Sequence, residues 1–228
     1  PAITMSLYFV IFGNLIGKRI GTMGGFSYME FIVPGLIMMA VIINSYANVV
    51  SSFFGARYNR SIEEMLVSPM PNWLIILGYT AGGMFRGVVV GIIVTLLGVW
   101  FSGLHIQHIF LTAFVMLLCS FLFCLAGLVN GVFSRKFDDT AIITTFVLTP
   151  LTYLGGVFYS ISLLPPVWRF VSRFNPVHYV IELFRYAMLS GSGSEGTLWF
   201  PLILVILIAV GLFVLCVTLM NKGIGLKV

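Results

Sequence analysis

The stretch Arg57-Tyr58-Asn59-Arg60-Ser61-Ile62-Glu63-Glu64 is a charged insert between two apolar runs that are each long enough to cross a membrane. Of the 228 residues, 60% are hydrophobic and only 8% are charged. A soluble domain carries roughly 25% charged residues, and a membrane-crossing helix needs about 20 mostly apolar residues. The sequence therefore predicts an integral membrane protein that meets water at such inserts.

The apolar runs indicate helices rather than barrel strands. In hydrocarbon every backbone polar group must be paired within the protein, which leaves helical bundles and closed barrels. Barrel strands would alternate apolar and polar residues over about ten positions, whereas these runs are continuous. We predict an all-α membrane protein with six spans, at residues 2–16, 28–54, 73–101, 106–133, 138–159 and 198–220. Because the chain starts at Pro1 inside an apolar run, we expect the start of the first span to be missing from this sequence.

Residues 160–197 form a long segment between the fifth and sixth expected spans. Its Pro and Gly residues interrupt it too often for a span, yet it is too apolar for an open loop. We predict two short interfacial or re-entrant helices. Pro165-Pro166 can start the first, and Asn175-Pro176 supplies a cap and a first-turn proline for the second. The side chains that suit lipid headgroups and phosphates are Tyr159, Trp168, Arg169, Arg173 and Tyr179.

The charged residues give a weak indication of orientation. One expected side carries Arg57, Arg60, Arg135, Lys136, Lys222 and Lys227, and the other carries Lys18, Arg19, Arg169, Arg173 and Arg185. We place the first side in the cytoplasm because its cations lie nearest the span ends. The net charge of +5 is scattered, so no nucleic-acid partner is expected. Cys119, Cys124 and Cys216 lie inside apolar runs, which indicates small core residues.

The insert after the second span has two interpretations. Ser61 and Glu64 have the spacing of a capping box, and Pro69 ends the segment. Ile62, Met65 and Leu66 form an apolar edge. The segment is either a solvated turn with an accidental cap or a short helix that docks in a partner's groove. We expect the edge to have nothing in its own chain to pack against.

The third span carries glycines at helical spacing. Gly83, Gly87 and Gly91 share one face, as do Gly78 and Gly82, and small residues at this spacing allow two helices to approach closely in lipid. Arg86 lies among them, where it either anchors the helix or takes part in transport.

Uncharged polar side chains form stripes on the second and fifth spans. Asn44, Asn48 and Ser52 follow one another at four-residue steps, and Thr145, Thr149 and Thr152 share a second face. Such groups either hydrogen-bond within and between helices or line a path for a neutral or amphipathic substrate.

A series of motifs follows in a fixed order along the chain: Ile62-Glu63-Glu64-Met65-Leu66-Val67-Ser68-Pro69, Phe137-Asp138-Asp139, Leu151-Thr152-Tyr153-Leu154-Gly155-Gly156-Val157-Phe158-Tyr159, Leu164-Pro165 and Asn175-Pro176. In this order the chain resembles the ABC-2 type family of ABC-transporter permeases, in its inner-membrane branch, over essentially its whole length.

The resemblance implies a single ABC-2 type transmembrane domain over residues 1–228 that pairs as a homodimer and binds two copies of a cytoplasmic ATPase subunit. ATP and magnesium would bind that partner, and this chain would hold no cofactor, no metal and no catalytic residue. The resemblance assigns residues 57–71 to a coupling segment and residues 160–197 to an external gate, and it implies that the second and fifth spans line the path. The implied coupling residues are Arg60, Ser61, Ile62, Glu63, Glu64, Met65 and Leu66; the implied gate residues are Pro165, Trp168, Arg169, Asn175 and Pro176.

The function implied is ATP-driven export of an amphipathic, lipid-linked or drug-like molecule across the inner (plasma) membrane. The alternative is an ion- or proton-coupled secondary transporter, a class that usually shows internal repeats and intramembrane acids. A membrane-embedded enzyme would need catalytic groups that we do not find. Residues 13–18 differ from a phosphate-binding loop because the spacing is one residue short and Arg19 replaces Ser or Thr. We therefore expect ATP hydrolysis in a separate subunit.

Overall fold

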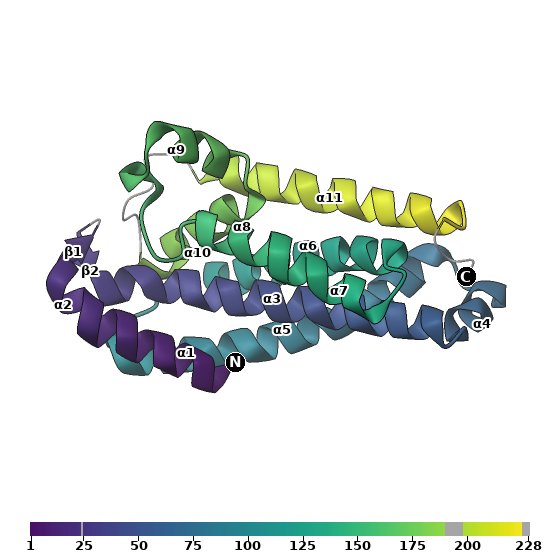
Figure 1. The fold of residues 1–228 in the computed structure, drawn as a ribbon, viewed down its shortest axis with the longest axis horizontal. Coiled ribbons are helices and arrows are strands. Elements are labelled where there is room, and N and C mark those ends of the chain that lie inside the picture. The colour runs from purple at the N-terminus through teal and green to yellow at the C-terminus, as the bar shows by residue number, and fades with distance from the viewer. Residues whose placement is uncertain (24, 190–197, 225–228) are drawn as a thin grey trace.

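The computed structural model describes residues 1–23, 25–189 and 198–224. Its long helices run side by side along one axis (Figure 1). In chain order the elements are α1 (Ala2–Tyr8), the π-helix η1 (Phe9–Ile16), α2 (Gly17–Ile20), strands β1 (Thr22–Met23) and β2 (Phe26–Ser27), α3 (Tyr28–Tyr58), α4 (Ser61–Val67), α5 (Asn72–Ser102), α6 (Ile109–Phe133), α7 (Phe137–Ile143), the π-helix η2 (Thr144–Leu148), α8 (Thr149–Leu154), the 3-10 helix η3 (Ile161–Leu163), α9 (Pro166–Arg173), α10 (Pro176–Leu189) and α11 (Trp199–Asn221).

Four helices in the described part of the chain are long and apolar enough to cross a membrane: α3, α5, α6 and α11. The most apolar stretch of α3 is 78% buried inside the protein, against 22% for α5 and for α11. The main packing contacts of α3 are with α5 and α6. The helix α3 is therefore the centre of the bundle, and α5 and α11 lie at its periphery.

The first and fifth expected spans are helical but interrupted. Each contains a π-helical segment, Phe9–Ile16 in one and Thr144–Leu148 in the other. Pro150 cannot donate to the helical ladder, and the Thr149 hydroxyl donates to the Thr144 carbonyl at 3.0 Å, across the wider π turn. The fifth helical run ends at Leu154, earlier than expected, because a Gly155-Gly156 turn follows. Six spans therefore remains a prediction.

The helix boundaries depend on caps and on contacts with distant residues. Ser27 and Glu30 form a capping box at the start of α3, with Glu30 N–H donating to Ser27 Oγ at 3.3 Å and Ser27 N–H donating to Glu30 Oε2 at 2.9 Å. The helix continues to Tyr58, four residues beyond the expected end of the second span, so Arg57 is helical. The helix α6 starts at Ile109, later than expected, because residues 107 and 108 donate backbone hydrogen bonds to the end of α10.

The glycines of α5 behave as two separate sets. Gly83, Gly87 and Gly91 are buried against α3 and α6, as expected, and a Cβ at Gly87 would lie 1.8 Å from Ser45 Oγ. A Cβ at Gly78 or Gly82 would meet no described atom within 4 Å. The first set therefore mediates close helix packing, whereas the second has open space beside it.

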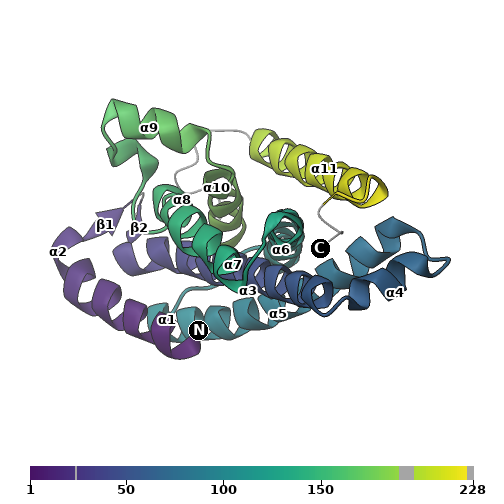
Figure 2. The same cartoon turned by 45° about the vertical axis from the view of Figure 1, so that its right-hand side comes forward.

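The bundle has two distinct ends (Figures 1 and 2). At one end lie α4, the start of α5 and the end of α11, where Asn72 Nδ2 donates to Asn221 Oδ1 at 2.7 Å. At the other end lie α2, the β1–β2 hairpin and α9. We call these the α4 end and the α9 end. Lys227, expected on the α4 side, lies outside the described residues. The three cysteines are buried, as expected for core residues.

Candidate functional site

The expected coupling segment is a short helix that projects at the α4 end. The helix α4 follows Arg60, whose backbone is left-handed at φ 61°. Glu63 and Glu64 are exposed in its first turn, and Val67 is 88% exposed in its last. The outer face of α4 is therefore acidic with one apolar side chain at its end.

The apolar edge of α4 packs on its own chain, so the expectation that it has no internal partner is wrong. Ile62 is fully buried in a cluster that also contains Phe53 of α3, Ile76 of α5, Leu128 of α6 and Leu219 of α11. Met65 and Leu66 are half-buried against the same cluster. Folding therefore covers Ile62 completely and Met65 and Leu66 in part, without any second protein.

The capping box expected at Ser61 and Glu64 does not form. The hydroxyl of Ser61 donates to the Ala56 carbonyl at 3.1 Å, back toward the end of α3. This contact ties α4 to α3 instead of capping the first turn of α4. The two glutamates remain favourably placed at the positive end of the helix dipole.

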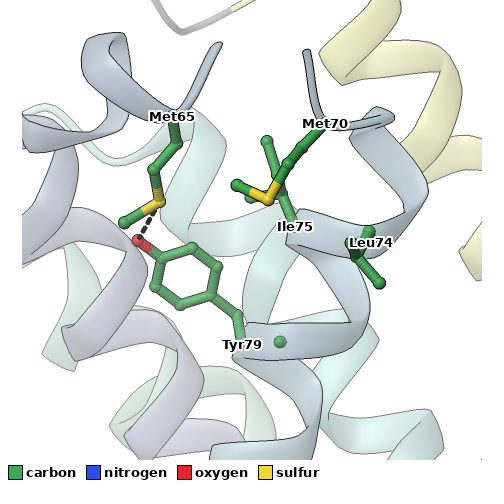
Figure 3. A pocket seen from close by; sticks show the side chains of 6 residues that line it. Met65, Met70, Leu74, Ile75 and Tyr79 are labelled. Atoms are coloured by element: carbon green, nitrogen blue, oxygen red, sulfur yellow. Dashed lines mark hydrogen bonds between the residues drawn. The ribbon is translucent and has the colours of Figure 1, made fainter. Parts of the chain in front are cut away.

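An apolar pocket of about 380 Å³ lies between α4 and the first turns of α5 (Figure 3). The hydroxyl of Tyr79 points across it and donates to Met65 Sδ at 3.9 Å. Gly78 has no side chain to fill the space. The lining residues are Met65, Met70, Leu74, Ile75, Gly78 and Tyr79.

Arg57 is buried at the α4 end, in a role that the sequence did not indicate. Its guanidinium donates to the carbonyls of Gly131, at 3.1 Å, Val132 and Ser134, which are among the last carbonyls of α6 and the residue after it. It also lies over the Phe54 ring, 5.5 Å from the centroid. A cation at a helix C-terminus satisfies carbonyls that have no intrahelical partner. Arg57 therefore fixes α6 to α3 beside the expected coupling segment.

The polar stripe on α3 runs from the interior of the bundle to its surface. Asn44 and Asn48 are half-buried and Ser52 is exposed. Asn44 Nδ2 donates to the Ala40 carbonyl one turn earlier, at 2.9 Å. This contact satisfies the amide within its own helix, which is the simpler of the two readings for such a side chain.

The second stripe lies on η2, which packs beside α3, and on α8, which packs against η2 and α10. Thr145 is exposed, Thr149 is half-buried and Thr152 is buried. The Thr152 hydroxyl donates to the Thr149 carbonyl at 2.7 Å, so it too is satisfied locally. The fold thus brings η2, which carries Thr145, beside α3, but no hydrogen bond joins the stripes in the parts of the chain described.

The expected external gate forms two short helices at the α9 end. The helix α9 starts at Pro166 after Pro165, and Asn175 Oδ1 accepts from the Val177 N–H at 3.0 Å at the start of α10, both as predicted. Asn175 Nδ2 also donates to the Leu151 carbonyl at 2.6 Å, which ties α10 to α8. Trp168 is exposed, and Arg169 donates to the carbonyls of Ser162 and Leu164. Residues 190–197 of the expected segment lie outside the described residues.

A cluster of titratable side chains lies along α10. His178 Nε2 is 3.5 Å from Glu182 Oε2, and Arg185 follows one turn later. Burial, followed by the charges of Arg185 and Arg173, lowers the pKa of His178 to about 4, and burial raises the pKa of Glu182. His178 is therefore neutral at pH 7. The sequence predicts Arg185 only as one of the external cations and indicates no individual role for His178 or Glu182.

Comparisons with known proteins place this arrangement in one family. Residues 1–189 match the family model described as ABC-2 type transporter. The chain is 53% identical over 227 residues to the inner membrane transport permease YadH of Escherichia coli K12, covering all of this chain and 88% of that protein. It is 26% identical over 190 residues to nodulation protein J of Rhizobium leguminosarum bv. trifolii, covering 80% of this chain and 70% of that protein. With its apolar helices, the chain is a multi-pass membrane protein and belongs to the ABC-2 type transporter family.

Proposed function

We propose that this chain is the permease subunit of an ATP-driven exporter in the inner membrane. Two copies would pair in the membrane, and two copies of an ATP-binding subunit would dock at the α4 end. An amphipathic or lipid-linked substrate would pass between α3 and the η2–α8 run and leave through the α9–α10 gate. Family membership and the likeness to an inner membrane transport permease support the subunit assignment.

The single observation that carries the coupling assignment is the burial of Ile62. Its side chain lies in the same cluster as residues of α3, α5, α6 and α11. Because a packed core transmits displacement instead of absorbing it, a force on the exposed face of α4 reaches the central helix α3 directly. The acidic outer face of α4 then contacts the ATP-binding subunit, and the buried face passes the resulting displacement to α3.

The test is co-purification of the permease with its ATP-binding subunit. Replacing Glu63 and Glu64 with Lys should reduce the amount of bound ATPase or abolish its stimulation by the permease, because reversing two charges opposes the complementary surface. Asp138→Lys is the matched control, because it also reverses the charge of an exposed acid. Asp138 follows Ser134, whose carbonyl accepts from Arg57 at the α4 end. Normal assembly and normal ATPase stimulation with both glutamates reversed would rule out α4 as the docking site.

The energy source separates this proposal from a gradient-driven carrier. ATP hydrolysis by the complex should rise when the permease is reconstituted in lipid with its partner, and it should not respond to a protonophore. Stimulation that vanishes when the proton gradient collapses would favour the ion- or proton-coupled alternative.

A further inference from the structure

Arg185 links three elements at the α9 end. Its Nη2 donates to the Gly156 carbonyl at 2.9 Å, and its Nε donates to the Phe31 carbonyl at 3.4 Å. The guanidinium also lies over the Phe31 ring, 3.9 Å from the centroid. One side chain of α10 therefore holds both the start of α3 and the turn after α8.

At the same junction the backbone of α3 lies in close contact with the backbone of the turn after α8. A Cβ at Gly35 of α3 would lie 2.6 Å from the Val157 carbonyl oxygen, so only glycine allows this approach. Gly156 has φ +85°, a backbone conformation that is strained for any residue with a side chain. Arg185 thus donates to the carbonyl of a turn that is itself pressed against α3.

The arginine has a second possible partner within its own helix. Glu182 precedes Arg185 by three residues, a spacing at which helical side chains meet. Among the described residues no carboxylate lies within ion-pair distance of Arg185, because Glu182 is directed to the neutral His178 instead. The guanidinium is therefore held by carbonyls and a ring, and it can exchange them for a carboxylate without leaving α10.

We propose that Arg185 is a reversible latch that holds α10 against α3 in the resting state, and that its transfer to Glu182 opens the path toward the α9 end. This inference rests on the proposed path between α3 and the η2–α8 run. The two carbonyls with the Phe31 ring are one set of partners, and the Glu182 carboxylate is the other. These two sets give the two states that a switching element requires. Charged hydrogen bonds and a desolvated cation–π contact are each strong enough to bias such an equilibrium.

The experiment uses the permease with its ATP-binding subunit in proteoliposomes, in a background without Cys119, Cys124 and Cys216. Asn44→Cys reports on the path through its reaction with a membrane-impermeant maleimide added at the α9 end. In the otherwise unaltered protein we expect labelling only with ATP and magnesium. Arg185→Gln should raise the nucleotide-free labelling rate by about tenfold or more. Arg135→Gln, which alters an exposed arginine just after α6 and away from the α9–α10 gate, should leave the rate unchanged.

A second measurement separates the latch from the path. If Arg185→Gln does not assemble, Phe31→Leu keeps the carbonyl but removes the ring, and it should raise the nucleotide-free rate by a smaller factor. Equal nucleotide-free rates in the reference protein and in the assembled variants would overturn the latch while leaving the path intact. No labelling at position 44 in any state would overturn the path and with it the latch. A thermal double-mutant cycle between Arg185 and Phe31 would still measure the contact itself.

Discussion

At the scale of single residues, two buried side chains hold the helices together at the α4 end. Arg57 supplies donors to carbonyls at the end of α6, and Ile62 fills the cluster between the spans. Both belong to the charged insert at residues 57–64, which the sequence predicts to meet water. The polar insert is therefore anchored from inside, and only its outer face is free for a partner.

Replacing Arg57 with Met should lower the thermal stability of the detergent-solubilised protein. The change removes charge-assisted hydrogen bonds and leaves buried carbonyls without donors, which costs about 1.5–3 kcal/mol. Arg60→Met is the matched control, because Arg60 is exposed three residues later. Thermal unfolding measures both, and equal melting temperatures for the two variants would contradict the capping role.

Ile62 and Val67 should separate folding from docking. Ile62→Ala empties part of a closed core and should cost about 2–5 kcal/mol, read as a lower melting temperature. Val67→Ala alters a side chain that is 88% exposed, so stability should not change. If α4 is the docking helix, Val67→Ala should instead weaken binding of the ATPase subunit. The reverse pattern, a stable Ile62 variant and an unstable Val67 variant, would show that the two faces of α4 are wrongly assigned.

At the scale of elements, α5 presents two different faces along one helix. Its inner glycines let α3 approach until Ser45 on α3 and Ser120 on α6 share a hydrogen bond of 2.7 Å. A Cβ at either outer glycine, Gly78 or Gly82, would meet no described atom within 4 Å. The same residue type therefore marks close helix packing at one position and an open surface five residues earlier.

Gly87→Ala and Gly82→Ala should change the stability of the protein in opposite directions. At Gly87 the added methyl group would lie 1.8 Å from Ser45 Oγ and must push α5 from α3, so stability should fall by about 1–3 kcal/mol. At Gly82 nothing obstructs the methyl group, and the gain in helix propensity is up to about 1 kcal/mol. Thermal unfolding of the two purified variants measures the difference; a destabilised Gly82 variant would reveal a partner on the outer face.

At the scale of the whole molecule, the bundle separates the α4 end, where we propose coupling, from the α9 end, where we propose the gate. Arg57 and Arg60 lie next to α4 in the chain and Lys222 follows α11, at the α4 end; Arg169 and Arg173 lie on α9, and Arg185 on α10 contacts the start of α3 at the α9 end. The central helix α3 runs between them and contacts α4 at one end and the Arg185 junction at the other. In the mechanism that we propose, a displacement of α4 reaches the α9–α10 gate along this one continuous helix.

The sidedness of the bundle can be measured directly. Single cysteines at Val67 and at Phe170, both exposed, should react with an impermeant maleimide from opposite faces of the membrane. We expect position 170 to react in intact cells or spheroplasts and position 67 to react only after the membrane is opened. Reaction of both from the same side would contradict a chain that crosses the membrane between α4 and α9 an odd number of times.

The amino-acid sequence alone determined the membrane class, the four long spans, the packing face at Gly83, Gly87 and Gly91 and the start of α10 at Pro176. These features depend on local hydrophobicity, on helical spacing and on backbone chemistry, which neighbouring residues decide. Only the tertiary structure decided that Ile62 is covered by its own chain, because its partners come from four different spans. It also decided the contact of Arg185 with Phe31, 154 residues apart. Whether a polar or apolar side chain is free, buried or paired depends on which distant element the fold places beside it.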